Sequence, residues 1–259
     1  MKIDLLQNYL QMKKIVLIAL FTIAYNVLSA QNATDIVRKA DEKMDGEKSS
    51  ISTMTMTIVR PTWTRTVKFK NWVKGRQYAL TLIEEPIKDK GRTFLKLKNE
   101  MWSWSPSISQ LRKLPPSMMS QGWMGSDFTN DDVLKESSLV VDYTHKLLGS
   151  ETIENLDCYK IELIPKPEAA ISWGKLILWI SKLSYLQLKA EYYDEDGLLA
   201  KTEIASKIKK MDDREIPTHM EIIPEENKGQ KTLVEINSMK FNAPIEDSFF
   251  SIQNMKNVK

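Results

Sequence analysis

Few side chains in this 259-residue sequence have the types and spacing needed for acid–base or metal chemistry. The two histidines, His145 and His219, lie in separate strand-like stretches, and neither has a second ligand at the spacing of a zinc site. The one cysteine, Cys158, lies between Asp157 and Tyr159 in another strand-like stretch and is expected to be a small buried side chain. The sequence therefore predicts no metal site and no bound cofactor.

Other patterns of catalytic residues are missing as well. The sequence has neither a G-x-S-x-G nucleophile motif nor a glycine-rich phosphate loop. Two acidic pairs, Asp131-Asp132 and Asp212-Asp213, consist of adjacent residues, which do not face each other as catalytic carboxylates must, and they fit a helix cap and a turn. We expect a protein that is not an enzyme. The alternative, an enzyme acting on lipids, would need polar side chains gathered inside an apolar cavity.

Residues 101–128 instead combine the side chains that hold apolar ligands. This stretch contains three of the seven tryptophans, and Trp102 and Trp104 are two apart, so both rings point to one face of a strand. A methionine- and tryptophan-rich segment follows Pro115-Pro116, and methionine adapts to irregular apolar shapes. We predict a wall and a lid around an apolar ligand. An ordinary core strand with a loop packed on it is the alternative.

The charge of the chain excludes two classes of binding protein. Lysine and arginine number 37 against 34 acidic residues, for a net charge of +3. A nucleic-acid-binding protein normally shows a basic face or stripe, and a surface that binds anionic lipid by charge alone needs a polybasic cluster. Five arginines, however, are spread through the first half of the chain and either order lipid headgroups at a cavity rim or lie on solvated strand faces: Arg60, Arg65, Arg76, Arg92 and Arg112.

The N-terminal residues have the pattern of an export signal. Met12-Lys13-Lys14 is followed by an apolar run and by the small pair Ser29-Ala30, which predicts a signal peptide cleaved after Ala30, with residues 1–11 as an upstream extension. An uncleaved membrane anchor is the alternative, but the apolar run is only about 11 residues long, short of the roughly 20 that a spanning helix needs. Residues 31–259 are expected to form a single exported domain.

The remaining chain alternates between apolar and polar side chains, which is the pattern of half-buried antiparallel strands. One short amphipathic helix precedes them, with Ile36, Val37, Ala40 and Met44 on one side, and a second short helix is predicted at residues 132–137. The predicted fold is mainly β: a curved antiparallel incomplete β-barrel of about 10–12 strands with an N-terminal helix and a short helical lid insertion. Because one helix and one lid cannot cover such a sheet, we predict a concave apolar cavity.

The export signal and several strings, DIVRKADEKM, MTMTIVR, RTVKFKNWVKG, MWSWSP and SMMSQGWMGSDFTNDDVL, together resemble the LolA-like superfamily of periplasmic lipoprotein carriers, often labelled outer membrane lipoprotein-sorting proteins. The resemblance extends from about Asn32 to the C terminus and is carried mainly by the last string. The founding carrier latches its lid with an inward arginine; Arg65 is the nearest candidate here, although that role is not transferred to it.

The resemblance implies a carrier that holds acyl chains of lipoproteins or lipids, without chemistry, for transport to the outer membrane. An inner-membrane transporter is the implied partner, nucleic acid is not, and the protein is expected to be a monomer. The alternative is a lipoprotein-binding envelope sensor or interaction module with no transport role. The candidate cavity wall consists of Met54, Met56, Ile58, Val67, Phe69, Leu80, Leu82, Trp102 and Trp104. The candidate lid consists of Met118, Met119, Trp123, Met124 and Phe128.

Overall fold

A computed structural model describes residues 33–43, 48–98, 100–119, 121–130, 138–169, 171 and 173–259. The predicted signal peptide, at residues 1–30, and the predicted short helix, at residues 132–137, lie outside the described residues. Among the residues that are described, none belongs to a helix both long and apolar enough to cross a membrane.

The described part of the chain contains 13 β-strands and a helix at residues 33–43. The strands are β1 (Ser49–Arg60), β2 (Trp63–Lys74), β3 (Tyr78–Glu85), β4 (Thr93–Leu97), β5 (Glu100–Ser105), β6 (Gln110–Lys113), β7 (Tyr143–Ile153), β8 (Leu156–Pro165), β9 (Lys175–Ser181), β10 (Gln187–Tyr193), β11 (Leu199–Met211), β12 (Arg214–Pro224) and β13 (Lys231–Phe241).

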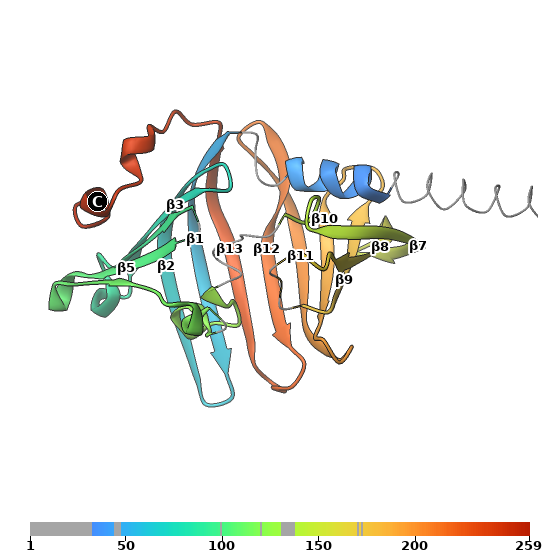
Figure 1. Cartoon of the computed structure of the whole chain (residues 1–259), viewed down its shortest axis with the longest axis horizontal. Helices are drawn as coiled ribbons and strands as arrows, with labels where there is room; N and C mark the ends of the chain where they lie inside the picture. The colour runs from blue at the N-terminus through green and yellow to red at the C-terminus, as the bar shows by residue number, and fades with distance from the viewer. Residues whose placement is uncertain are drawn as a thin grey trace, which may run out of the picture.

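All of these strands belong to one antiparallel, curved and unclosed sheet, as predicted (Figure 1). Its order is β6-β5-β4-β3-β2-β1-β13-β12-β11-β10-β9-β8-β7, so that β6 and β7 form its two edges. The pairing of β1 with β13 brings the two halves of the chain together at the centre of the sheet. The strand that the alternation pattern missed is β6, which is only four residues long and lies in the segment assigned to the lid.

The register of the strands assigns each side chain to one of two faces. Ile58 lies opposite Thr232, which lies opposite Ile222, and the same row continues through Glu203 to Ala190. Residues directly opposite one another on neighbouring strands point the same way. We call the side that bears this row the front face and the other side the back face.

The helix at residues 33–43 covers one half of the front face (Figure 1). Its buried residues Ile36, Val37 and Ala40 pack in one cluster with Ile161 and Ala190 of β8 and β10, as their helical spacing predicted. The fourth residue predicted for this stripe, Met44, lies outside the described residues. The other half of the front face, over β1–β4, is covered by described residues that follow β6, among them Met119, Trp123 and Phe128.

The back face of β2–β5 is covered by the C-terminal residues, which follow β13 as the 3-10 turn η5 (Asp247–Phe249) and the short helix α3 (Ile252–Met255). Phe250 stacks on Tyr78 with 5.5 Å between ring centroids, and Phe249 packs against Trp72 at 5.3 Å. The hydroxyl of Thr93 donates a hydrogen bond of 2.7 Å to the carbonyl oxygen of Met255. The last residues of the chain therefore complete a second apolar layer.

Replacing Phe250 with alanine should destabilise the protein, because its ring is 3% exposed and its loss would leave a cavity against Tyr78. We expect the free energy of unfolding in urea to fall by about 3–5 kcal/mol. The control, Ile87→Ala, removes a side chain that is 90% exposed and should change that free energy by no more than about 0.5 kcal/mol. A similar loss in the two variants would show that the C-terminal segment does not cover this face.

His145 of β7 joins the N-terminal helix to the sheet. Its Nε2 lies 2.7 Å from the carbonyl oxygen of Leu139, and its Nδ1 lies 3.0 Å from Oγ1 of Thr34 in the helix. Burial lowers the pKa of His145 below its ordinary value, the hydrogen bond to Leu139 opposes this, and the charges of Lys166 and Arg38 add to the lowering. The folded protein therefore favours the neutral imidazole.

Because the folded-state pKa of His145 lies below the unfolded value of about 6.5, the unfolded chain binds more protons in the interval between them. The contribution of His145 to stability is thus present above about pH 6.5 and is lost as the pH falls through that interval. We expect the difference in unfolding free energy between the wild type and His145→Gln to be larger at about pH 7 than at about pH 5. Urea titrations at both values would measure it, and a difference independent of pH would contradict this role.

Candidate ligand-binding site

Residues 114–119 and 121–130, which we call the flap, lie against the front face of β1–β4. The flap contains the 3-10 turns η3 (Pro116–Met118) and η4 (Trp123–Gly125) and closes on itself through a bridge between Gly122 and Thr129. Trp123 is the centre of this contact, because it is 4% exposed and lies edge-on to both Phe69 and Phe94, at 5.6 and 5.3 Å between ring centroids.

The sharp turn of the flap depends on its glycines. A Cβ atom on Gly122 would lie 2.5 Å from the carbonyl oxygen of Ser126, so no other residue fits there without a backbone shift. Gly125 and Met124 both have positive φ angles, 78° and 55°, and this region is unfavourable for a side chain such as that of methionine. The turn holds Trp123 and Met124 so that both pack into the apolar cluster beneath the flap.

The structure brings most of the predicted wall and lid together in that cluster. The cluster contains five residues of the predicted wall, which are Met54, Met56, Ile58, Val67 and Phe69. It also contains four residues of the predicted lid, which are Met119, Trp123, Met124 and Phe128. Met118 of the predicted lid is half-buried, and its carbonyl oxygen accepts a hydrogen bond of 2.8 Å from Asn130. Sequence reasoning missed other members of the cluster, among them Ile83, Phe94, Met101, Ile222 and Val234.

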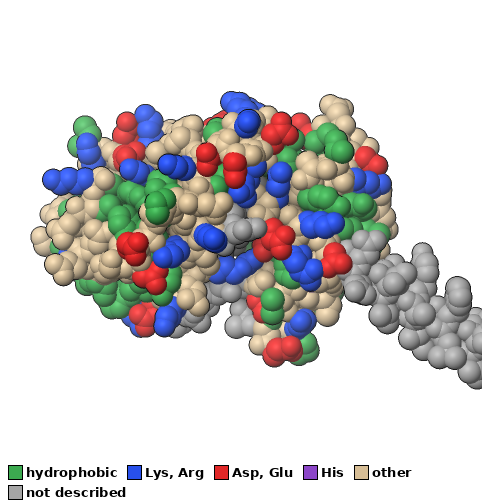
Figure 2. Space-filling model, turned by 90° about the horizontal axis from the view of Figure 1, so that it is seen from above, with side chains coloured by type: hydrophobic (Ala, Val, Ile, Leu, Met, Phe, Trp, Pro, Cys, Tyr) green, Lys and Arg blue, Asp and Glu red, His purple; other side chains and the backbone are tan. Residues whose placement is uncertain are grey.

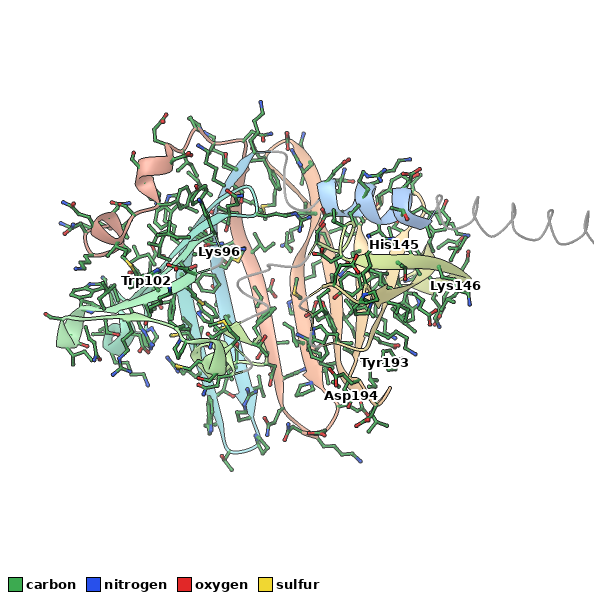
Figure 3. The ribbon with its side chains drawn as sticks, in the orientation of Figure 1. Lys96, Trp102, His145, Lys146, Tyr193 and Asp194 are labelled. Carbon is green, nitrogen blue, oxygen red and sulfur yellow. The ribbon has the colours of Figure 1, made fainter. Side chains whose placement is uncertain are left out.

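The other four predicted wall residues lie on the back face, so the expectation of one wall containing all nine is corrected. Leu80 lies opposite Trp72 of β2 and opposite Leu95 of β4, which in turn lies opposite Trp102 of β5. Leu82 and Trp104 both lie opposite Thr93 and therefore point to the same side. All four belong to the layer beneath the C-terminal segment, and Figure 3 shows Trp102 at that end of the sheet.

The physical reason is that both faces of this part of the sheet are apolar. Residues 80–83 of β3 are all buried, with Leu80 and Leu82 on the back face and Ile83 on the front face, where it lies opposite Phe69. Alternation shows that Leu80 and Leu82 share a face, and that Trp102 and Trp104 share one, but it does not show which face. The unbroken apolar character of residues 82–83 was the signal that the back face is covered as well.

Two arginines fasten the flap to the sheet. The guanidinium of Arg60, at the end of β1, donates hydrogen bonds of 3.0 Å to each carboxylate oxygen of Asp127 and one of 2.9 Å to the carbonyl oxygen of Gly125. Arg65 of β2 donates a longer bond, of 3.3 Å, to the carbonyl oxygen of Met124. Thr232 of β13 donates a bond of 2.7 Å to Asp127. We call these contacts the flap latch.

The flap latch is nearly closed to solvent, since the side chains of Arg60 and Asp127 are 12% and 10% exposed. Breaking a buried ion pair by removing one partner costs about 3–5 kcal/mol, because the other charge stays buried without its partner. If the flap moves away from the sheet, however, both charges return to water together. The latch therefore favours a closed flap without making it permanent.

The flap's own side chains fill the space over the predicted wall, so the described conformation is a closed one. Two depressions lie elsewhere: one of about 460 Å³ on the back face between Trp72 and Phe249, and one of about 360 Å³ beside the helix, near Lys39 and Arg214. An acyl chain placed on the front-face wall would need the volume that Trp123 and its neighbours occupy.

A polar row separates the flap half of the front face from the helix half. Lys201 of β11 is 5% exposed, lies 3.6 Å from Glu203 and has its ammonium group 4.4 Å from the centre of the Tyr192 ring. The hydroxyl of Tyr192 donates a hydrogen bond of 3.1 Å to Glu203. A ligand beneath the flap would therefore meet a polar boundary on the side of β11.

The residues considered at first for metal or nucleophilic chemistry lie apart. His219 Nδ1, on the central strand β12, is 2.6 Å from the carboxylate of Glu235, whereas His145, on the edge strand β7, contacts the helix (Figure 3). Cys158 is buried, and burial raises the pKa of its thiol. Within the described ranges, the His, Cys, Asp and Glu side chains form no group of three or more that would hold a metal ion. Charged side chains of both signs are interspersed over the face seen in Figure 2.

The fold is that of several solved proteins. A DUF1329 family protein from Desulfovibrio piger is 25% identical, with a TM-score of 0.79 over 88% of this chain and 99% of that one. An outer membrane lipoprotein-sorting protein domain from Vibrio parahaemolyticus is 22% identical, with a TM-score of 0.77 over 88% and 99% of the two chains. A LolA superfamily protein from Nitrosomonas europaea is 24% identical, with a TM-score of 0.72 over 85% and 98%.

A comparison with curated protein sequences finds no match. The model of a protein family described only as "-like: Uncharacterized protein" matches residues 75–257, which is well over half of the chain and runs from the turn before β3 to the C-terminal segment. The chain belongs to that family, and its fold is the one shared by the LolA-superfamily outer membrane lipoprotein-sorting proteins.

Proposed function

We propose that this protein carries acyl chains of lipoproteins or lipids across the periplasm to the outer membrane, holding them on the front face beneath the flap and performing no chemistry on them. The observation that carries the proposal is the cluster in which the lid residues Trp123, Met124 and Phe128 cover the wall residues Met56 and Phe69. In the proposed loaded state, an acyl chain takes the place of the flap side chains.

The energetics of this exchange suit a carrier. An acyl chain gains about 0.8 kcal/mol for each CH₂ group that leaves water, whereas exposing a buried tryptophan, methionine or phenylalanine costs about 1.5–3 kcal/mol per side chain. The binding free energy is therefore the difference between the free energy gained by burying the acyl chain and the free energy lost by exposing the flap side chains. Such a difference keeps the affinity moderate, which a protein that must release its load requires.

We further propose that a cleaved signal peptide at residues 1–30 exports the chain, that it acts as a monomer, and that an inner-membrane transporter delivers the load. The fold shared with outer membrane lipoprotein-sorting proteins supports an envelope location. The alternative is a lipoprotein-binding sensor, which would hold one stable protein partner instead of exchanging lipid.

The most direct test is to identify what the protein binds in its own host. We expect native mass spectrometry of protein purified without detergent to show lipid or lipoprotein in a one-to-one complex, and organic extraction to release it. The same analysis of the variant Met56→Lys, which places a charge in the apolar wall, should show less. Protein that carries no acyl chain in either preparation, together with a stoichiometric protein partner, would support the sensor instead.

Weakening the flap latch should raise the affinity for acyl chains. In Asp127→Asn, Arg60 loses its buried ionic partner, so the closed flap becomes less favourable by up to about 3–5 kcal/mol. Since the apparent dissociation constant falls as the open, competent fraction rises, binding of a fluorescent fatty acid should tighten roughly tenfold or more.

The matched control is Lys68→Ala, which breaks an ion pair with Glu85 whose partners are 48% and 57% exposed on the back face. Its affinity for the fatty acid should equal that of the wild type, because exposed pairs contribute about 0–1 kcal/mol. Unchanged or weaker binding by folded Asp127→Asn would contradict the idea that flap and acyl chain compete for one space.

A further inference from the structure

The junction of the flap and the sheet contains buried hydrogen-bond donors that have no partner. Among the described residues, the buried side-chain nitrogen and oxygen atoms without one are Nε of Arg65, Nε of Arg92 and Nε1 of Trp123. Buried polar groups are normally paired, so a group of unpaired ones calls for an explanation. All three are N–H donors, and a set of donors matches a ligand that is rich in acceptors.

These donors belong to one neighbourhood. The ring of Phe94 contacts Trp123 at 5.3 Å between centroids, and it lies 5.0 Å from the guanidinium carbon of Arg92. Arg65 reaches the flap beside Trp123, through its bond to the carbonyl oxygen of Met124. The three donors therefore surround the place where the flap meets β2 and the start of β4.

A third arginine adds positive charge to this neighbourhood. Arg112 of β6 lies opposite Ser103 of β5, which lies opposite Phe94, so Arg112 is on the front face as well. Burial lowers the pKa of Arg92, the carboxylate of Asp89 opposes this, and the charges of Arg65 and Arg112 lower it further. A guanidinium nevertheless stays charged in proteins. Arg92 is thus close enough to Arg65 and Arg112 to be affected by both positive charges, and the carboxylate of Asp89, which also acts on Arg92, already binds Arg65 at 2.6 Å.

We propose that Arg65, Arg92 and Arg112 form an anion site that receives the phosphate group of an amphipathic ligand whose acyl chains lie beneath the flap. This inference rests on the proposed function and extends it by assigning the chemical class of the head group. Guanidinium groups suit phosphate because their planar N–H pairs bind two oxygens at once, and charge-assisted hydrogen bonds are the strong ones.

Such a site would couple head-group binding to opening of the flap. Arg65 divides its guanidinium between Asp89 and the flap carbonyl of Met124, and the second of these bonds is the longer, at 3.3 Å. A phosphate that binds Arg65 competes with the Met124 carbonyl for its N–H groups. The bound anion therefore favours the state in which the flap has left the sheet, which is the state that admits the acyl chains.

The test compares two lipids with identical acyl chains, phosphatidylglycerol and diacylglycerol, each displacing a fluorescent fatty acid from the full-length mature protein. We expect the wild type to bind phosphatidylglycerol roughly tenfold or more tightly than diacylglycerol. Arg112→Gln and Arg92→Gln should each reduce that ratio severalfold and leave the affinity for diacylglycerol unchanged. Arg112 is exposed, so its variant should fold normally even if Arg92→Gln does not.

A charge-matched control and inorganic phosphate complete the design. Arg38→Gln removes one positive charge from an exposed ion pair on the helix, and it should keep the wild-type ratio. Inorganic phosphate should compete with phosphatidylglycerol but not with diacylglycerol, and Arg112→Gln should weaken that competition. Displacement of the fluorescent fatty acid by inorganic phosphate at low millimolar concentration, with no displacement by either lipid, would assign the site to free phosphate and overturn the lipid head group.

The outcomes separate this inference from the proposed function. Equal affinity of the wild type for the two lipids, with no effect of Arg112→Gln, would overturn the anion site while the carrier function stands. Displacement by neither lipid would overturn the carrier function, and with it the assignment of a lipid head group. A loss of affinity for both lipids in folded Arg112→Gln would likewise overturn the inference, since it would show a general effect on the pocket.

Discussion

An unclosed sheet with apolar residues on both faces must have each face covered, and this requirement governs the rest of the structure. The N-terminal helix covers the front face of β8–β10, the C-terminal segment covers the back face of β2–β5, and the flap covers the front face of β1–β4. The first cover is continuous helix, and the second completes a layer of stacked rings. The flap differs from both in the nearly buried ion pair between Arg60 and Asp127, which holds it to the sheet in addition to its apolar packing.

The combination of apolar packing and a small polar latch gives the flap its functional character. Trp123 packs on the wall in the way that an apolar ligand would, so the closed flap keeps the apolar front face covered when no acyl chain is bound. The latch stabilises the closed flap further. All of this stabilisation is lost when Arg60 and Asp127 separate and both charges return to water. In the proposed carrier, binding of an acyl chain is therefore an exchange of occupants on the wall that β1 and β2 contribute to.

The sequence was sufficient for the type of fold, the helix stripe and the front-face residues of β1 and β2, because alternation and helical spacing depend on local chain geometry. Alternation also paired Trp102 with Trp104 correctly, yet their face depended on the C-terminal segment, which lies far away in the chain. The latch could not be predicted, since Arg60 and Asp127 are 67 residues apart and only the completed sheet brings them together. The short strand β6 was hidden within the segment assigned to the lid.

Hydrogen exchange of the flap amides, with and without a bound acyl chain, tests the central claim most directly. In the closed state the amide of Trp123 donates to the carbonyl oxygen of Phe128, and the amide of Asp127 donates to the hydroxyl of Thr232. If the acyl chain replaces the flap on the wall, these amides should exchange faster in the loaded protein, while the amides of β1 stay as protected as before. Binding of the acyl chain with flap amides that exchange at the same rate, or more slowly, would contradict the account.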